Sequence, residues 1–248
     1  MSILVPAKNE QAVLANLVQN LFHLDYPATH LDIWIIDDGS TDATSNIVEK
    51  FVRIRPQVRL IRLPRNRGKG HAVRTGVLNA YGRLILFTDA DGATPIAELQ
   101  RLESALDTNI PIAIGSRALA STSTHVHTRW YRRLLGRCFN AYVNLLLLPG
   151  LQDTQCGFKL FEAKVARFLF ERQHADRYSF DVELLYIARR AGIGFAEVAI
   201  NWTNVPGSKV NLVADSIRMA IDVMRYRLRH RNVPSFPLPA SVQPHQTE

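Results

Sequence analysis

Two aspartates, Asp89 and Asp91, close an apolar run that begins at Leu84, and Gly92 follows them. On an extended backbone, residues two positions apart point the same way, so both carboxylates would face one point in space. Two such carboxylates would repel each other, and the pKa of one would rise. A divalent cation removes that repulsion, favours oxygen ligands and leaves positions open for phosphate oxygens. The motif therefore indicates either a metal site for a diphosphate or an ordinary turn, in which Asp and Gly are common.

Two other segments carry residues that suit a nucleotide. Asp37 and Asp38 end another apolar run, where carboxylates can accept hydrogen bonds from a base or from ribose hydroxyls. A helix N-cap cluster is the alternative there. Residues 65–70, Arg-Asn-Arg-Gly-Lys-Gly, place cations such as Lys69 before a helix, which favours anion binding. This spacing is not that of a P-loop, and a solvated basic loop is the alternative.

Apolar runs alternate with helical patterns through the first half of the chain. Strands are expected at 3–5, 32–36, 58–63, 84–88 and 112–115, and helices at 10–24, 42–51, 70–80 and 96–106. This rhythm predicts an α/β fold with a mainly parallel sheet flanked by helices and joined by right-handed crossovers. Ligands of such sheets bind at the carboxyl ends of the strands. The loops at 6–10, 37–40, 65–70 and 89–92 should therefore meet along one edge.

The second half of the chain is less regular. Its expected strands lie near 158–161 and 193–200, and its shorter helices near 164–172 and 180–191. Residues 129–148 are expected to form a helix with arginines first and leucines after, and 211–231 a basic amphipathic helix. Both patterns suit binding to a membrane surface, and a helix packed on the core with a solvated face is the alternative. The proline-rich tail at 232–248 is expected to be disordered.

Composition limits the possible functions. The 248 residues carry a formal net charge of +8, which favours anionic partners such as nucleotides or lipid surfaces. Aromatic residues are few and are not interleaved with the basic runs, so a nucleic-acid-binding module is not favoured. Two cysteines are too few for a disulfide framework. Without a signal peptide or an apolar run of about 18 residues, we expect a cytoplasmic protein peripheral to a membrane.

The ordered set of motifs resembles the family 2 glycosyltransferases of GT-A fold. In the first half, the matching segments are 5–10, 37–40, 66–70 and 89–91. In the second half, segments similar to the dolichyl-phosphate β-glucosyltransferases are 115–117, 153–161, 201–203 and 207–209. The resemblance covers about residues 2–231. It implies one GT-A domain over 1–231, with a nucleotide-sugar half at 1–118 and an acceptor half at 119–231 that ends in an amphipathic interface helix.

The resemblance also implies an activity. It is the inverting transfer of glucose from UDP-glucose to a polyprenyl phosphate of the dolichyl type, which gives a β-linked lipid phosphosugar. The similar dolichyl-phosphate mannosyltransferases use GDP-mannose and usually carry Ser-Gly-Phe where this chain has Cys156-Gly157-Phe158, so the glucosyl branch is favoured. Because the acceptor phosphate is already ionised, no strong general base is expected. Arginines would instead offset the repulsion between the two anions.

Family roles extend to individual residues of the first half. The residues that would frame the base and the ribose are Pro6, Ala7, Glu10 and Asp38. Lys69 joins them as a nucleotide-binding residue from the basic loop.

The phosphate-binding roles come next. Asp89 and Asp91 would hold Mg²⁺ or Mn²⁺ on the donor diphosphate, and Lys209 would close over that diphosphate from a loop. Arg117 and Arg132 would face the donor diphosphate and the acceptor phosphate. The candidate catalytic residues are Asp91, Arg117 and Arg132. The neighbouring arginines at 129 and 133 are near enough to replace Arg132, and Asp153, His71 and His174 are expected to be structural.

Two other enzyme classes remain as alternatives. Residues 89–94 are superficially similar to the nucleophile loop of haloacid-dehalogenase-type phosphohydrolases, in which Asp89 would be phosphorylated. That loop normally follows the first strand of its core, whereas here it follows about the fourth. Processive polysaccharide synthases share the first-half motifs, but Val126 occupies the Gln position of their Gln-x-x-Arg-Trp motif.

Overall fold

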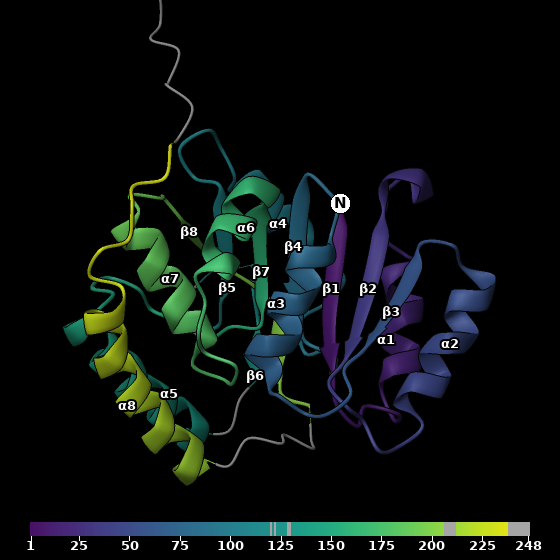
Figure 1. Cartoon of the computed structure of the whole chain (residues 1–248), viewed down its shortest axis with the longest axis horizontal. Helices are drawn as coiled ribbons and strands as arrows, with labels where there is room; N and C mark the ends of the chain where they lie inside the picture. Colours follow the sequence, from purple (N-terminus) through teal and green to yellow (C-terminus); the bar gives the residue numbers. More distant parts are fainter. Residues whose placement is uncertain (120, 122, 128–129, 206–211, 238–248) are drawn as a thin grey trace, which may run out of the picture.

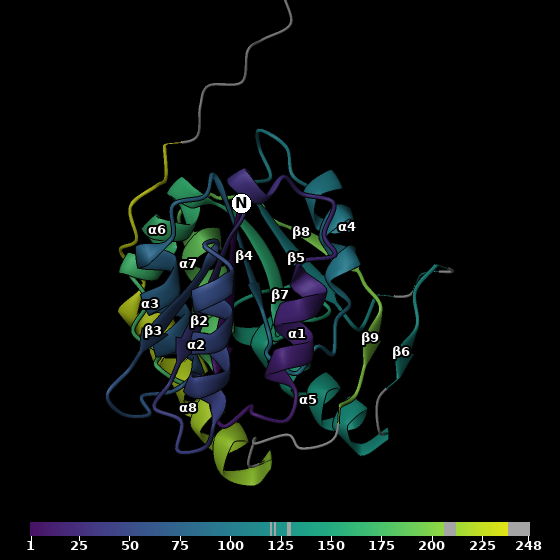
Figure 2. The ribbon, with the colours of Figure 1, turned by 90° about the vertical axis from the view of Figure 1, so that its right-hand side faces the viewer.

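The computed structural model describes residues 1–119, 121, 123–127, 130–205 and 212–237 (Figure 1). Its centre is a seven-stranded sheet with the strand order β3-β2-β1-β4-β7-β5-β8. These strands are β1 (Ser2–Ala7), β2 (Asp32–Asp37), β3 (Val58–Arg62), β4 (Leu84–Thr88), β5 (Ile112–Ser116), β7 (Phe158–Glu162) and β8 (Ala196–Ala199). Two shorter strands, β6 (Val126–His127) and β9 (Trp202–Thr203), pair with each other and stand apart from the main sheet (Figure 2).

The sheet is parallel except at one strand, which confirms the predicted mainly parallel α/β fold. β7 runs antiparallel to both of its neighbours, β4 and β5. In this register Phe158, at the start of β7, lies opposite Thr88, at the end of β4. The turn that leads into β7 is therefore brought to the carboxyl edge of the sheet, beside the aspartates that follow β4.

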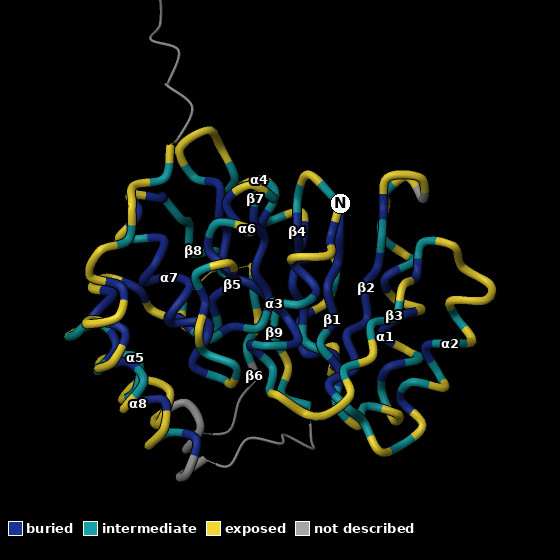
Figure 3. Tube along the Cα trace, in the orientation of Figure 1, coloured by how far each residue is buried: buried dark blue, intermediate teal, exposed yellow. Residues whose placement is uncertain are grey.

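Helices cover both faces of the sheet, and alternation along each strand supplies the two cores (Figure 3). In β1, Ile3 and Val5 join one buried cluster, while Leu4 between them joins the other. The first cluster includes residues of α1 (Leu14–Leu21), α2 (Thr44–Ile54) and α4 (Leu99–Ser104). The second includes residues of α3 (Lys69–Asn79), α6 (Ala163–Glu171) and α7 (Phe180–Arg190). Two 3₁₀ turns, η1 (Ala28–His30) and η2 (Ile96–Glu98), precede β2 and α4.

Two long helices, α5 (Trp130–Leu146) and α8 (Leu212–Arg229), lie side by side at the end of the molecule beyond α7 (Figure 1). The Tyr142 hydroxyl donates to the Ala220 carbonyl at 2.9 Å and so joins them. Both helices were predicted. Within the described ranges, none of the helices combines the length and hydropathy that crossing a bilayer would need.

Some boundaries differ from those expected. The helix expected at 10–24 begins only at Leu14, since Asn9 adopts a positive φ of 53° and residues 11–13 form a turn. The start of the expected disordered tail is folded onto the domain. Phe236 packs edge-to-face on Phe168 at 5.0 Å between ring centroids, and its backbone N–H donates to the Ala191 carbonyl at 2.9 Å. The proposed division at residue 118 stays a prediction.

Candidate active site

The loops at the carboxyl ends of β1, β2, β3 and β4 meet at one edge of the sheet, as predicted. Loop 37–40 and loop 65–70 are in direct contact, because a Cβ atom on Gly39 would lie 2.7 Å from the Arg65 carbonyl carbon. Gly39 has a φ of +64°, a conformation that glycine adopts without strain. The approach of these two loops leaves no room for a larger residue.

Asp38 holds the two loops together. Its two carboxylate oxygens accept hydrogen bonds from the backbone N–H groups of Arg67 and Gly68, each at 2.8 Å, and the residue is buried. Its neighbour Asp37 is also buried and accepts from Ser40 N–H at 2.8 Å and from the Ser45 hydroxyl, so it organises the turn before α2. If Asp38 contacts the ribose as expected, its carboxylate must accept that hydrogen bond in addition to the two that fix the basic loop.

The other expected base and ribose residues lie on the same edge. Pro6 and Ala7 end β1 and pair with the last residues of β2, and Ala7 is buried. Glu10 is half-buried in the turn before α1, and its N–H donates to the Thr44 hydroxyl at 2.8 Å. The structure thus places Pro6, Ala7, Glu10 and Asp38 around one stretch of the sheet edge.

The Asp89 and Asp91 carboxylates lie beside the first residue of α3. Lys69 Nζ is 2.6 Å from Asp89 Oδ1, and Asp91 Oδ1 accepts from Ala93 N–H at 3.0 Å. Although burial opposes it, the charges of Asp89 and Asp181 raise the pKa of Lys69, which keeps the ammonium charged. Desolvation by surrounding protein and the charge of Asp89 raise the pKa of Asp91, as expected for two neighbouring carboxylates.

This donor set fits a divalent cation. Two carboxylates supply hard oxygen ligands, and their mutual repulsion is what a cation would remove. The described residues contain no group of three or more His, Cys, Asp or Glu side chains suited to a metal. A cation held by Asp89 and Asp91 would therefore keep positions for diphosphate oxygens and water, in the manner usual for Mg²⁺ at phosphate sites.

Gly157 supports the Asp89 carboxylate from the other side, a role that the sequence did not reveal. Asp89 N–H donates to the Gly157 carbonyl at 3.1 Å, and a Cβ atom on Gly157 would overlap the Asp89 carboxylate. This approach exists because β7 is antiparallel to β4. The sequence analysis used the Cys-Gly-Phe segment only for its family resemblance. It could not predict the contact with Asp89, because that contact depends on the direction of β7.

A buried ion pair lies behind this support. Lys159 Nζ is 2.5 Å from Asp181 Oδ1 and donates to the Cys156 carbonyl, and the Lys159 side chain is 1% exposed. Burial raises the pKa of Asp181, although the positive charges of Lys159 and Lys69 oppose the shift. Sequence analysis missed this pair, whose members lie 22 residues apart in the chain.

Arg117 is held by a carboxylate rather than being a free surface cation. Its Nε and Nη2 donate to the two oxygens of Asp153 at 2.7 and 2.9 Å, and its backbone N–H donates to Asp153 at 3.0 Å. Burial opposes ionisation of Asp153, but the charge of Arg117 prevails and lowers the pKa of that carboxyl. The expected structural role of Asp153 agrees with this geometry. Arg117 is thereby oriented, and its guanidinium also lies 5.6 Å from the centre of the Trp202 ring.

Two expected phosphate ligands have side chains that fall outside the described part of the structure. Arg132 belongs to the first turn of α5, but its side chain is outside the described part of the structure. Lys209 lies outside the described residues altogether.

Comparisons with known proteins identify the family and the fold of this chain. The family model described as Glycosyl transferase family 2 matches residues 2–170. The dolichyl-phosphate beta-glucosyltransferase of Dictyostelium discoideum is 39% identical over 243 residues, which cover 93% of this chain and 74% of that protein. The human protein of the same name is 38% identical over 244 residues, covering 93% of this chain and 75% of its own length.

A solved structure shares the fold at lower identity. It is glucosyl-3-phosphoglycerate synthase from Mycobacterium tuberculosis in complex with Mn²⁺ and uridine-diphosphate-glucose. The two chains superpose with a TM-score of 0.67 at 19% identity, over 94% of this chain and 79% of the other. The fold is therefore that of a GT-A glycosyltransferase.

Proposed function

The chain belongs to glycosyl transferase family 2, and we propose that it transfers glucose from UDP-glucose to the phosphate of a dolichyl-type polyprenyl lipid. The observation that carries this proposal is the 38–39% identity to dolichyl-phosphate beta-glucosyltransferases over 93% of the chain. That match includes the sheet edge on which the carboxylates and cations described above converge. Family membership also sets aside the phosphohydrolase alternative, in which Asp89 would be a nucleophile.

The donor would bind along the carboxyl edge of β1, β2 and β4. Pro6, Ala7 and Glu10 would frame the base and the ribose, while Asp38 keeps the basic loop in place beside them. Mg²⁺ or Mn²⁺ held by Asp89 and Asp91 would stabilise the negative charge that grows on the leaving nucleoside diphosphate.

Four cationic side chains would complete the charge balance. Lys69 lies against Asp89 and adds a positive charge beside the diphosphate. Arg117 is aimed by Asp153, which leaves its remaining guanidinium N–H groups for an anion. Arg132 and Lys209 are proposed as further phosphate ligands on the basis of their family positions. Together these groups would allow two anionic substrates to approach each other.

The transfer reaction then does not require a strong general base. A phosphate monoester is mostly ionised near neutral pH and can attack the anomeric carbon directly. The attack comes from the face opposite the leaving diphosphate, so the α-linked donor gives a β-linked product. The protein's contribution is alignment of the two substrates and neutralisation of their charge.

Because the proposed acceptor is a lipid, the enzyme would act at a membrane surface. α8 exposes Ile217, Ile221, Met224 and Leu228, which recur at helical spacing, and several arginines lie between them. Such a helix binds at the interface of an anionic bilayer. We propose that α5 and α8 dock there and that the protein acts as a peripheral enzyme on the cytoplasmic face.

A transfer assay tests this function. Radiolabelled UDP-glucose or GDP-mannose is incubated with a short polyprenyl phosphate, with Mg²⁺, with Mn²⁺ and with EDTA. We expect labelled lipid from UDP-glucose only, loss of transfer in EDTA, and a fall of at least about 10²-fold in rate for Asp91→Asn. A preference for GDP-mannose would instead support the mannosyltransferase alternative. Metal-independent transfer would contradict the role assigned to the two aspartates.

A further inference from the structure

Glu183 lies in α7, is fully buried and takes no part in the site described above. One of its carboxylate oxygens, Oε2, accepts hydrogen bonds from the backbone N–H groups of His174 at 3.0 Å and Ala175 at 2.7 Å. The other, Oε1, lies 2.7 Å from Nε2 of His230, just beyond the end of α8. A buried carboxylate needs such partners. Two of them belong to the α6–α7 connection, residues 172–179.

The α6–α7 connection packs directly against the backbone on both sides of Lys69. A Cβ atom on Gly68 would overlap the Asp176 carbonyl oxygen, and one on Gly70 would overlap the Ala175 carbonyl oxygen. Both overlaps are with backbone atoms, which cannot turn aside as the end of a flexible side chain can. The close approach of residues 175 and 176 therefore explains why glycines flank Lys69.

Hydrogen bonds join the same two stretches of chain. His71 N–H, in the first turn of α3, donates to the Asp176 carbonyl at 3.0 Å. The buried Gln173 side chain donates through Nε2 to the Gly70 carbonyl at 3.0 Å. The connection thus fixes the place at which α3 begins, and Lys69 is the first residue of that helix.

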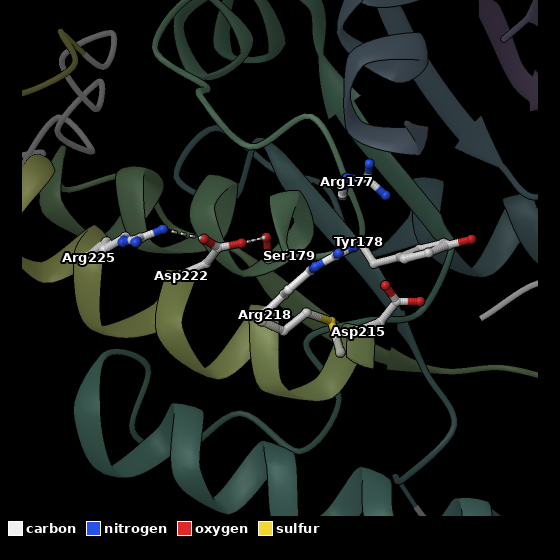
Figure 4. A pocket seen from close by; sticks show the side chains of 8 residues that line it. Arg177, Tyr178, Ser179, Asp215, Arg218, Asp222 and Arg225 are labelled. Atoms are coloured by element: carbon white, nitrogen blue, oxygen red, sulfur yellow. Dashed lines mark hydrogen bonds and ion pairs between the residues drawn. The ribbon is translucent and has the colours of Figure 1, made fainter. Parts of the chain in front are cut away.

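The far end of the connection is held by α8. The Ser179 hydroxyl donates to Asp222 Oδ2 at 2.7 Å beside a cavity of about 310 Å³ (Figure 4). The Tyr226 hydroxyl donates to Ser179 Oγ at 2.8 Å. These bonds tie α7 to α8 without involving Glu183, so they provide a control for its effect.

The place of Lys69 matters because its ammonium nitrogen lies 2.6 Å from Asp89 Oδ1. Charge-assisted hydrogen bonds to a carboxylate or a phosphate depend on distance and angle. A displacement of about 1 Å at the start of α3 would therefore weaken the contribution of this ammonium. A continuous set of contacts leads from Glu183 through residues 174–176 and the two glycines to Lys69.

We propose that Glu183 is a positioning residue for Lys69. It holds residues 174 and 175, and with residue 176 these support the backbone of Gly68 and Gly70, so the ammonium is set in place for the donor diphosphate. The proposal rests on the proposed function for the diphosphate as the ligand of Lys69.

A double-mutant cycle on the full chain tests whether Glu183 acts through Lys69. UDP is titrated calorimetrically, with Mn²⁺ present, into the wild type, Glu183→Leu, Lys69→Met and the double variant. Leucine fills a similar volume but offers no acceptor to the N–H groups of His174 and Ala175. Glu183→Gln is the conservative variant, because its amide oxygen can still accept those bonds. All proteins are first compared in thermal unfolding.

Glu183→Leu should weaken UDP binding about tenfold or more, the effect expected when one charged hydrogen-bond donor is misplaced. In the Lys69→Met background, the same substitution should change the affinity less than about twofold. Glu183→Gln should bind UDP within about threefold of the wild type. Tyr226→Phe removes a buried hydrogen bond of the α7–α8 contact and should bind UDP within about twofold of the wild type.

Equal losses in both backgrounds would overturn the proposal, because Glu183 would then affect binding by a route other than Lys69. Unchanged affinity in either single variant, Glu183→Leu or Lys69→Met, would also overturn it. If Glu183→Leu does not fold, Gly70→Ala takes its place in the cycle. Its methyl group would push the start of α3 away from Ala175 while Glu183 stays intact, so the same loss and the same dependence on Lys69 are expected.

Transfer kinetics separate this proposal from the proposed function. If glucose is transferred, Glu183→Leu should raise KM for UDP-glucose and leave KM for farnesyl phosphate within about twofold. A rise in KM for farnesyl phosphate alone would be evidence against the positioning role. A protein that shows the expected cycle with UDP but transfers no glucose to lipid would support the positioning role and contradict the proposed function. A wild type that does not bind UDP would contradict both.

Discussion

At the residue scale, the site depends on close backbone approach as much as on charge. Asp89 is placed between Lys69, which neutralises it, and Gly157, whose missing side chain makes room for its carboxylate. Asp38 uses both oxygens to fix the loop that carries Lys69. Both of these candidate site carboxylates are thus fixed by close contacts with a neighbouring loop.

Gly157→Ala tests that geometry. The added methyl group would push Asp89 away from its position, so we expect a fall in kcat of about 10²-fold and a loss of about 1–3 kcal/mol in the free energy of unfolding. Gly136→Ala is the control, because Gly136 is an exposed position of α5 where a Cβ atom meets nothing within 4 Å. The control should keep its activity and gain up to about 1 kcal/mol. Near-normal rates for Gly157→Ala would refute the packing argument.

The Arg117–Asp153 pair predicts a pH dependence of stability. Because the folded state lowers the pKa of Asp153 below its ordinary 3.8, the pair stabilises the protein above that pH. The contribution is lost as pH falls through the lowered value. Asp153→Asn should cost about 2 kcal/mol at pH 7, a figure reduced for the partial solvent exposure of Arg117, and the difference from wild type should shrink below about pH 4. Urea unfolding across this range measures it, and a difference that stays constant with pH would be evidence against the pair.

At the element scale, the antiparallel direction of β7 decides the site. It brings the turn before Phe158 to the edge where the parallel strands end, and the Lys159–Asp181 pair then joins this turn to α7. The sheet, its alternating helices and the four loops could be predicted, because periodicity and strand direction are local signals. The contacts of Gly157 and Lys159 could not, because they depend on how a distant strand inserts between β4 and β5.

Breaking the Lys159–Asp181 pair should be costly. Lys159→Met leaves the Asp181 carboxylate buried without its partner, and we expect a loss of about 3–5 kcal/mol in the free energy of unfolding. The double variant Lys159→Met/Asp181→Leu should recover most of that loss, because it removes the unpaired charge. Urea denaturation of the two proteins gives the comparison. A single variant that loses less than about 1 kcal/mol would show that the pair does not stabilise the turn.

At the scale of the whole molecule, the carboxyl edge of the sheet and the paired helices α5 and α8 form two surfaces of different chemistry. The first collects carboxylates and cations at the strand ends, and the second exposes apolar side chains beside arginines. The amphipathic pattern predicted these helices, but the cavity beside α8 could not be foreseen. Its lining comes from the segment before α7 and from α8, which are far apart in the sequence and meet where α7 packs against α8.

Membrane docking through α8 can be measured with vesicles. Ile221→Glu or Met224→Glu should lower binding to vesicles rich in anionic lipid by about tenfold or more, because each places a charge where an apolar side chain would be buried. Leu78→Glu, a similar change at an exposed apolar position of α3, should have little effect. Wild-type binding should also weaken as salt is raised. Equal losses in all three variants would point to a nonspecific charge effect rather than to docking through α8.

The central claim is a single displacement in which a lipid phosphate attacks glucose from the face opposite the leaving diphosphate. The most direct measurement is NMR of the product formed from UDP-glucose labelled with ¹³C at the anomeric carbon and farnesyl phosphate. The account predicts one product, farnesyl phosphate joined to glucose in the β configuration, formed only with divalent metal present. An α-linked product, or free glucose without any lipid phosphosugar, would contradict it.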